Sequence, residues 1–299
     1  MIAGGIATSG SLGPDGPRGG PTVLRMLLGV QLRRFREASG VTPDEAGYEI
    51  RASRSKISRM ENGRVGFKDR DVADLLTLYG VADIQVRAGL LSLARQANAQ
   101  SWWAGYSDLL ADWFQGYLGL EEAASLIGAY ELQFVHGLLQ TTDYARAVFM
   151  IGRKRAPAET IERLVSVRMQ RQRLLTAPAP PRLWAVMDET ALRRPIGGRE
   201  VMRAQLKHLV AAAELPNVTL QLLPLRRGGH AAGGGSFTIL QFAEPDLPDA
   251  VYIEQLTSAS YLEKREDVDY YCQVMDLLGT QAETPAATVK ALARAIRTI

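Results

Sequence analysis

The stretch TPDEAGYEIRASRSKISRMENGR, residues 42–64, decides the fold of the first part of the chain. Thr42 is suited to cap a helix, and Glu45 three residues later completes a capping box. Ser53 is suited to cap a second short helix, which we expect to end at Asn62. Two short helices joined by a tight turn form a unit whose second helix can enter the major groove of DNA.

The second helix of this pair divides into an apolar and a basic face. Ile57 and Met60 are expected to face inward, and Gly47 allows the two helices to approach closely. The outward positions are polar or basic: Arg54, Ser55, Lys56, Ser58 and Arg59. Residues 51–70 hold seven basic and two acidic side chains, whereas the whole chain has a net charge of only +3. Positive charge is therefore concentrated where a DNA-binding motif needs it.

Further helices surround this pair. Leu24, Leu28 and Leu32 lie on one face of a helix that Gly40 ends, and two more helices are expected around Val72–Tyr79 and over 83–98. We therefore predict an all-α, five-helix domain over residues 22–98. Residues 1–21 are rich in Gly, Ser and Pro and are expected to form a disordered arm. Whether this arm belongs to the native chain stays open.

The segment SRSKISRMENGR, residues 53–64, resembles the recognition helix of the Xre-type family, which is related to phage lambda repressor. The resemblance implies a lambda-repressor-like fold. It departs from the family at Pro43, where Gln is common, and at Arg51, where Gly is common and a positive φ would strain Arg. By position in the motif, we expect DNA contacts from Thr42, Ser53, Arg54, Ser55, Lys56, Ser58, Arg59, Asn62 and Arg64.

The second part of the chain mixes strands with helices. Strand-like runs occupy 183–187, 218–223, 237–242 and 250–254, and helices are expected at 157–175, 198–213 and 263–278. Aromatic-rich helices are expected to precede them. We predict a multidomain protein with a C-terminal domain at 99–299 that is mixed α/β or α+β.

The resemblance extends over nearly the whole chain from Gly20. Residues 65–81, 113–148, 187–198 and 215–224 are similar to actinobacterial, antitoxin-like transcriptional regulators that carry an uncharacterised C-terminal domain. His136 stands where that group has Pro. The resemblance implies control of development or secondary metabolism and a small protein partner.

Two groups of residues are candidates for binding an effector or partner. The first is a cluster of aromatic residues between Trp102 and Phe134, among them Phe114 and Tyr130. These side chains could form part of the core, a partner surface or a small-molecule pocket. The second is a helix face where Arg168, Arg171 and Gln172 could hold an acidic ligand or simply be solvated. The candidate residues are Trp102, Trp103, Tyr106, Trp113, Tyr117, Arg168 and Arg171.

The sequence offers little for other function classes. His136, His208 and His230 lack metal-type spacing, one cysteine excludes an intrachain disulfide, and no nucleophile motif occurs. We therefore expect no enzyme, no cofactor and no metal. Without an export signal or a long apolar run, we expect a cytoplasmic protein with no membrane association.

These patterns predict a sequence-specific DNA-binding transcriptional regulator that binds double-stranded DNA as a homodimer. Its C-terminal domain would sense a ligand or a protein. The alternative is an antitoxin-like protein-interaction module that sequesters a small protein partner and autoregulates its own operon.

Overall fold

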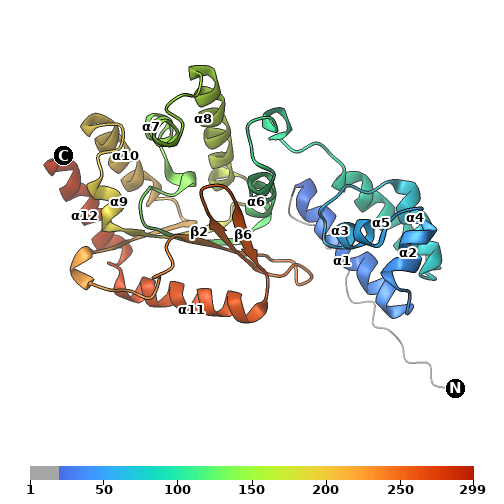
Figure 1. Cartoon of the computed structure of the whole chain (residues 1–299). Coiled ribbons are helices and arrows are strands. Elements are labelled where there is room, and N and C mark those ends of the chain that lie inside the picture. Colours follow the sequence, from blue (N-terminus) through green and yellow to red (C-terminus); the bar gives the residue numbers. More distant parts are fainter. Residues whose placement is uncertain (1–19) are drawn as a thin grey trace. The chain divides into compact units, whose positions relative to one another are not determined.

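The computed structural model describes residues 20–299, which divide into two compact units at Ser101 and Trp102 (Figure 1). The arm predicted for residues 1–21 lies, up to residue 19, outside the described residues. Its last two positions differ from the prediction, because Gly20 is the N-cap of helix α1 and Pro21 is its first residue. Proline suits this position since a missing N–H there would have no helical partner.

The first unit is helical, as predicted. Caps and glycines set the helix boundaries: Thr42 and Ser53 begin the second and third helices, and Gly63 and Gly80 adopt a positive φ just after the third and fourth. Its helices are α1 (Pro21–Ala38), α2 (Pro43–Glu49), α3 (Arg54–Glu61), α4 (Asp69–Leu78) and α5 (Ile84–Ala97). Leu28, Leu32, Ile57, Leu75 and Leu76 are fully buried between them.

The second unit contains a six-stranded mixed sheet in the order β3-β2-β1-β4-β5-β6, which confirms the mixed α/β class. The first three strands are parallel and the other neighbours antiparallel. The strands are β1 (Leu126–Glu131), β2 (Arg182–Asp188), β3 (Val218–Leu223), β4 (Phe237–Gln241), β5 (Ala250–Glu254) and β6 (Ala259–Leu262). The α-helices are α6 (Asp112–Ala123), α7 (Thr142–Gly152), α8 (Ala158–Gln172), α9 (Glu189–Arg193), α10 (Arg199–Ala212), α11 (Arg265–Gln281) and α12 (Pro285–Thr298).

Strand β1 corrects the sequence analysis. Helices are expected from the sequence in the aromatic-rich region before residue 157, but Tyr130 lies in β1 and Phe134 in the loop that follows. Short apolar runs do not distinguish a strand from a helix by spacing alone. In the fold, β1 pairs with β2 on one side and β4 on the other, so it is a central strand.

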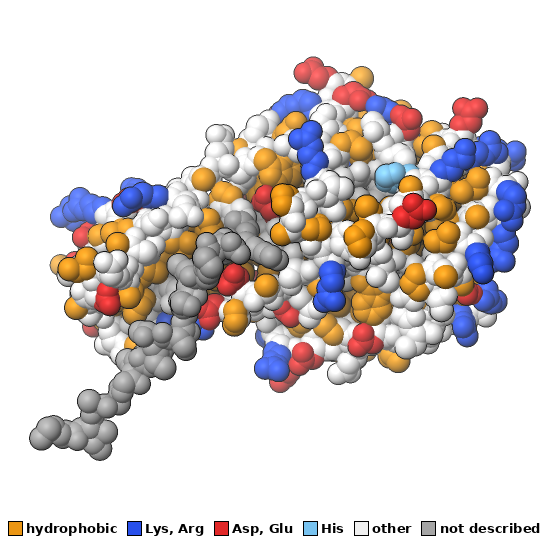
Figure 2. All heavy atoms as spheres, turned by 180° about the vertical axis from the view of Figure 1, so that it is seen from behind, with side chains coloured by type: hydrophobic (Ala, Val, Ile, Leu, Met, Phe, Trp, Pro, Cys, Tyr) orange, Lys and Arg blue, Asp and Glu red, His pale blue; other side chains and the backbone are white. Residues whose placement is uncertain are grey.

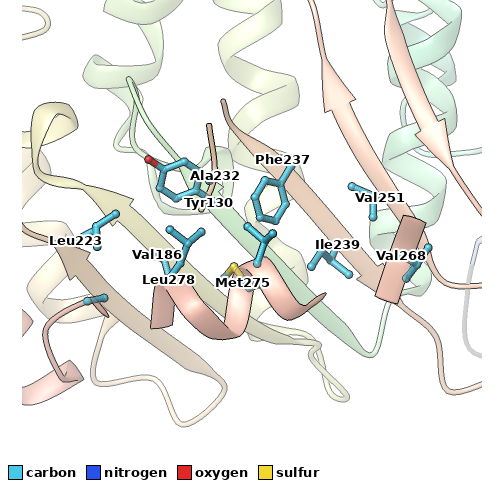
Figure 3. Close-up of a cluster of buried hydrophobic side chains, with 12 residues drawn as sticks. Tyr130, Val186, Leu223, Ala232, Phe237, Ile239, Val251, Val268, Met275 and Leu278 are labelled. Atoms are coloured by element: carbon cyan, nitrogen blue, oxygen red, sulfur yellow. The ribbon is translucent and has the colours of Figure 1, made fainter. Parts of the chain in front are cut away.

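Helices cover both faces of the sheet (Figure 1). On one face, Met275 and Leu278 of α11 pack against Tyr130, Val186 and Ile239 (Figure 3). Helices α6, α7, α8 and α10 lie on the other side. The strand directions bring the end of β1, the start of β4 and the end of β5 to one edge of the sheet. Polar side chains at Glu131 and Glu254 therefore share that edge.

Candidate functional site

The caps that begin α2 and α3 are formed as the sequence indicates. The Thr42 hydroxyl accepts a hydrogen bond from the Glu45 backbone N–H at 3.2 Å, and the Thr42 backbone N–H donates to Glu45 Oε2 at 2.7 Å. The Ser53 hydroxyl accepts from the Lys56 N–H at 3.3 Å. Both helix starts are thus fixed by local hydrogen bonds.

The turn between the two helices is tight and strained. A Cβ on Gly47 would lie 2.8 Å from the Ala52 carbonyl oxygen, so no larger residue fits there without a shift. Arg51 has a φ of 54°, the left-handed conformation that is costly for a residue with a Cβ. The strain expected from the sequence at Arg51 is therefore present in the turn.

A buried ion pair holds α3 against α1. Arg36 donates from Nε to Glu61 Oε1 at 2.6 Å and from Nη2 to Glu61 Oε2 at 3.0 Å, and its third nitrogen donates to the Val41 carbonyl at 3.1 Å. Both side chains are about nine-tenths buried. The hydrogen bonds that Arg36 donates to Glu61 raise the pKa of Arg36. Because the pair joins the end of α3 to α1, it fixes the direction in which α3 points.

Two arginines of α3 are presented to solvent. Arg54 lies 3.7 Å from the Asp44 carboxylate, with both side chains about 70% exposed. Arg59 is exposed and has no ion pair among the described residues. Lys56 differs from the expected outward position, because its ammonium donates to Asp71 Oδ2 at 2.7 Å and is half-buried. Lys56 therefore ties α3 to α4.

The other residues predicted to contact DNA surround these arginines. The Ser53 and Ser55 hydroxyls lie 2.9 Å apart, and the Asn62 amide donates to the Ser58 carbonyl at 2.8 Å. Arg64 is exposed just beyond the helix. One surface therefore carries exposed cations with short polar side chains between them, which suits contacts with phosphates and base edges.

The aromatic candidates of the second unit separate into two environments. Trp102, Trp103 and Tyr106 pack with Leu118 and Leu164 in a hydrophobic core. The other four candidates line one cavity of about 600 Å³: Trp113, Tyr117, Arg168 and Arg171. The structure thus brings together one aromatic pair and the two arginines and assigns the first three aromatics to packing.

Arg171 is buried rather than solvated. It donates from Nη2 to Glu121 Oε1 at 2.6 Å and from Nε to Glu121 Oε2, and its guanidinium lies 5.1 Å from the centre of the Tyr117 ring. Burial opposes its charge, but Glu121 outweighs that cost and raises the pKa of Arg171 above its ordinary value. Burial also raises the pKa of Tyr117, which donates to Glu121 Oε1 at 2.8 Å.

Comparison with family models places both units. A model described as a helix-turn-helix domain matches residues 27–89. A model described as a domain of unknown function (DUF5753) matches residues 114–294, which is more than half of the chain. The chain belongs to the DUF5753 family. No match to a curated protein or to a solved structure was found. The helix-turn-helix match supports a DNA-binding regulator, and it favours a regulator over an enzyme.

Several polar residues of the DUF5753 domain were not identified from the sequence. Glu121, Glu131 and Gln140 meet the arginines of α8 only because α8 lies over the sheet edge. Their spacing along the chain gives no sign of this. His136 is buried at the same cavity, and burial lowers its pKa far below the ordinary value, so it is neutral.

Among residues 20–299, none of the helices is long and apolar enough to span a membrane. No group of His, Cys, Asp and Glu side chains in that range could hold a metal ion.

Positive charge is also found outside the helix-turn-helix unit. Figure 2 shows Lys and Arg side chains gathered along one rim of the DUF5753 domain. Exposed basic residues of α9, α10 and α12 include Arg193, Arg199, Arg203, Lys207, Arg294 and Arg297. A test of DNA reading by α3 therefore needs a charge-matched control on these helices.

Proposed function

We propose that the protein is a sequence-specific transcriptional regulator in which Arg54 and Arg59 of α3 contact base edges in the major groove. The observation that carries this proposal is the exposure of both arginines on a helix whose position is fixed by the Ser53 cap and by the buried Arg36–Glu61 pair. An arginine guanidinium satisfies guanine O6 and N7 together. A rigid helix presents it without a further ordering cost.

Arg54 and Arg59 differ in the contacts that they make before DNA binds. Arg59 has its five donors available, whereas Arg54 must exchange its loose contact with Asp44 for a base or phosphate. Because that contact is exposed, its loss costs little. In this proposal Thr42, Asn62 and Arg64 contact phosphates, the three serines Ser53, Ser55 and Ser58 contact phosphate or base edges, and Lys56 positions α3 through Asp71.

The proposal extends to the assembly. We propose a homodimer in the cytoplasm that binds two half-sites about 34 Å apart or a multiple of that distance. The DUF5753 domain senses an effector or partner and shifts the balance between forms with different operator affinity. By resemblance, the regulated genes belong to development or secondary metabolism.

Fluorescence anisotropy with the protein's own promoter region tests the role of α3. We expect Arg59→Ala to weaken binding by about 10- to 100-fold, which corresponds to ~1–3 kcal/mol for one bidentate contact. Arg203→Ala on α10 removes the same charge from an exposed site and serves as the control. Equal losses in the two variants would show that overall charge, and not α3, determines the affinity.

The antitoxin-like alternative is an outcome of a second experiment. A small protein recovered in equal amount with the full chain from cells, together with unchanged promoter occupancy when that protein is depleted, would favour sequestration. Promoter occupancy that depends on Arg59, without such a protein, favours regulation through DNA.

A further inference from the structure

The cavity of the DUF5753 domain has the size and walls of a small-molecule site. Its volume of about 600 Å³ lies within the range of ligand pockets. It opens at the sheet edge where β1 and β5 end. Aromatic side chains from two helices, α6 and α7, and from strand β5 form much of its wall: Trp113, Phe114, Tyr117, Phe149 and Tyr252.

Arg168 is a cation of the cavity wall that forms no ion pair with another described residue, although the nearby carboxyl groups of Glu254, Glu121 and Glu131 favour its charge. Its Nη1 donates to the Gln140 amide oxygen at 3.0 Å, and its guanidinium lies 4.8 Å from the centre of the Phe149 ring. Within residues 20–299 no carboxylate forms an ion pair with it, whereas neighbouring Arg171 is paired with Glu121. Burial lowers the pKa of Arg168 to about 10, so it still carries its charge at neutral pH.

The loop beside Arg168 fixes the direction of its guanidinium. Gln140 donates to the Val135 carbonyl at 2.7 Å, and Gln172 donates to the carbonyls of Gly137 and Gln140 at 3.0 and 2.7 Å. A Cβ on Gly137 would lie 3.1 Å from Arg168 Nη1. Because Gly137 has no Cβ, there is space beside it for the Arg168 guanidinium. The guanidinium is therefore held in position before any ligand binds.

Glu131 supplies a second group suited to an anion. Its carboxyl group lines the cavity at the end of β1 and makes no hydrogen bond or ion pair with another described residue. Burial raises the pKa of Glu131 to about 8, against the opposing effect of Arg171 and Arg168. A carboxyl group that keeps its proton near neutral pH can donate a hydrogen bond to an anion.

We propose that this cavity binds a small aromatic carboxylic acid, with its carboxylate on Arg168 and its ring against the aromatic wall. A planar guanidinium pairs with a carboxylate through two parallel hydrogen bonds. The wall of aromatic rings accepts an apolar ring. Glu131, in its protonated form, donates to the same carboxylate.

The cavity also gives the ligand a route to the DNA-binding unit, and this step rests on the proposed function. Leu109, Leu110 and Trp113 line the cavity and follow soon after Ser101, where the first unit ends. A bound acid would contact this segment, which connects the wall of the cavity to α5. A shift of the segment on binding would change the affinity of the helix-turn-helix unit for an operator.

Calorimetric titration of the full chain with 2-naphthoate, indole-3-acetate and 3-phenylpropionate tests the site, and the corresponding amides serve as neutral controls. We expect at least one acid to bind saturably, its amide to bind at least ~10-fold more weakly, and Arg168→Gln to cause a similar loss. Arg155→Gln, an exposed position between α7 and α8, should bind like wild type. No saturable binding of any acid, equal binding of acid and amide, or equal loss in both variants overturns the proposal.

The pH dependence provides a test that does not depend on Arg168→Gln folding. Arg168, Arg171, His136 and Glu254 face Glu131 from the surrounding wall. Between pH 6.5 and 9 the arginines stay charged and His136 stays neutral. Affinity for the bound acid should fall as pH rises through about 8, where Glu131 loses its proton and repels the ligand, and Glu131→Gln should remove this fall. A wild-type affinity that is constant over this range contradicts the role of Glu131.

Binding of the acid and binding of DNA can fail separately. Arg59→Ala should bind the acid like wild type while losing DNA affinity. If the acid binds and no preference for the promoter is found, the proposed function fails and the cavity assignment stands. If the promoter is bound specifically and the acids are not bound, the cavity assignment alone fails.

Discussion

Among residues 20–299, each unit has one buried, bidentate Arg–Glu pair, and the two pairs have different surroundings. Arg36–Glu61 joins α1 to α3 inside a closed helical core, and the functional cations of that unit lie outside in solvent. Arg171–Glu121 joins α8 to α6 at the wall of a cavity, beside the unpaired Arg168. The first pair supports a surface that contacts DNA, and the second supports an interior that can receive a ligand.

Charged side chains are exposed at α3 and buried in the cavity, and this difference determines what each site can bind. At α3, exposed arginines gain little from the protein itself, so their charge is available to a polyanion. In the cavity, the burial of Arg168 carries a cost that a bound anion would offset. The surface of α3 can therefore carry several basic residues, whereas binding of an anion in the cavity depends on Arg168.

Removing one partner of each buried pair should have the largest effect. We expect Arg36→Ala and Arg171→Ala each to destabilise its own unit by about 3–5 kcal/mol, because a carboxylate is left buried without a partner. All four tryptophans lie in the second unit, at positions 102, 103, 113 and 184. Urea denaturation followed by tryptophan fluorescence should show the loss for Arg171→Ala.

Circular dichroism, which follows the helices of both units, supplies the matching measurement for Arg36→Ala. Unfolding of the first unit of Arg36→Ala at low urea concentration should change the circular dichroism and leave the tryptophan fluorescence unchanged. Equal shifts of the fluorescence transition in both variants would mean that the two units unfold together, and the comparison between separate sites would then be lost.

The helix-turn-helix unit could be predicted from its sequence because its determinants are local. The Thr42 box, the Ser53 cap and the glycines after the helices act within a few residues. The sequence indicated four residues of the cavity wall but not its carboxyl groups, since Glu121, Glu131 and Arg168 meet only after β1 and α8 have packed. The pattern located both arginines of α8 on one face but did not reveal their burial, which depends on the sheet.

Two glycines, Gly29 beside α3 and Gly137 beside the cavity, have neighbours that differ in how easily they can move. A Cβ on Gly29 would lie 2.5 Å from the backbone oxygens of Met60 and Glu61, which cannot move without shifting α3. A Cβ on Gly137 would meet the ends of the Arg168 and Arg171 side chains instead. We expect Gly29→Ala to cost about 1–3 kcal/mol and Gly137→Ala less than about 1 kcal/mol.

The same urea titrations measure both glycine variants, and each has a functional readout. Gly29→Ala should lower promoter affinity because it displaces α3. Gly137→Ala should lower acid affinity because it displaces the guanidinium of Arg168. A larger stability loss for Gly137→Ala than for Gly29→Ala would show that the surroundings of Gly137, and not those of Gly29, are the less able to move.

The smallest expected effect concerns the turn between α2 and α3. Arg51 has a positive φ, so Arg51→Gly should remove its steric cost while adding some entropy to the unfolded chain. We expect a net gain of up to about 1 kcal/mol in the free energy of unfolding of the first unit. Thermal unfolding followed by circular dichroism provides the measurement, and a destabilised variant would indicate that the Arg51 side chain makes a compensating contribution.

The measurement that tests the central claim most directly is competition between the protein's own promoter region and a scrambled DNA of equal length and composition. If α3 reads bases, wild type should prefer the promoter by about 4 kcal/mol or more, which is ~1,000-fold, at physiological salt. Equal affinity for both DNAs with a steep dependence on salt would contradict sequence reading, because it would show that phosphate contacts alone account for binding.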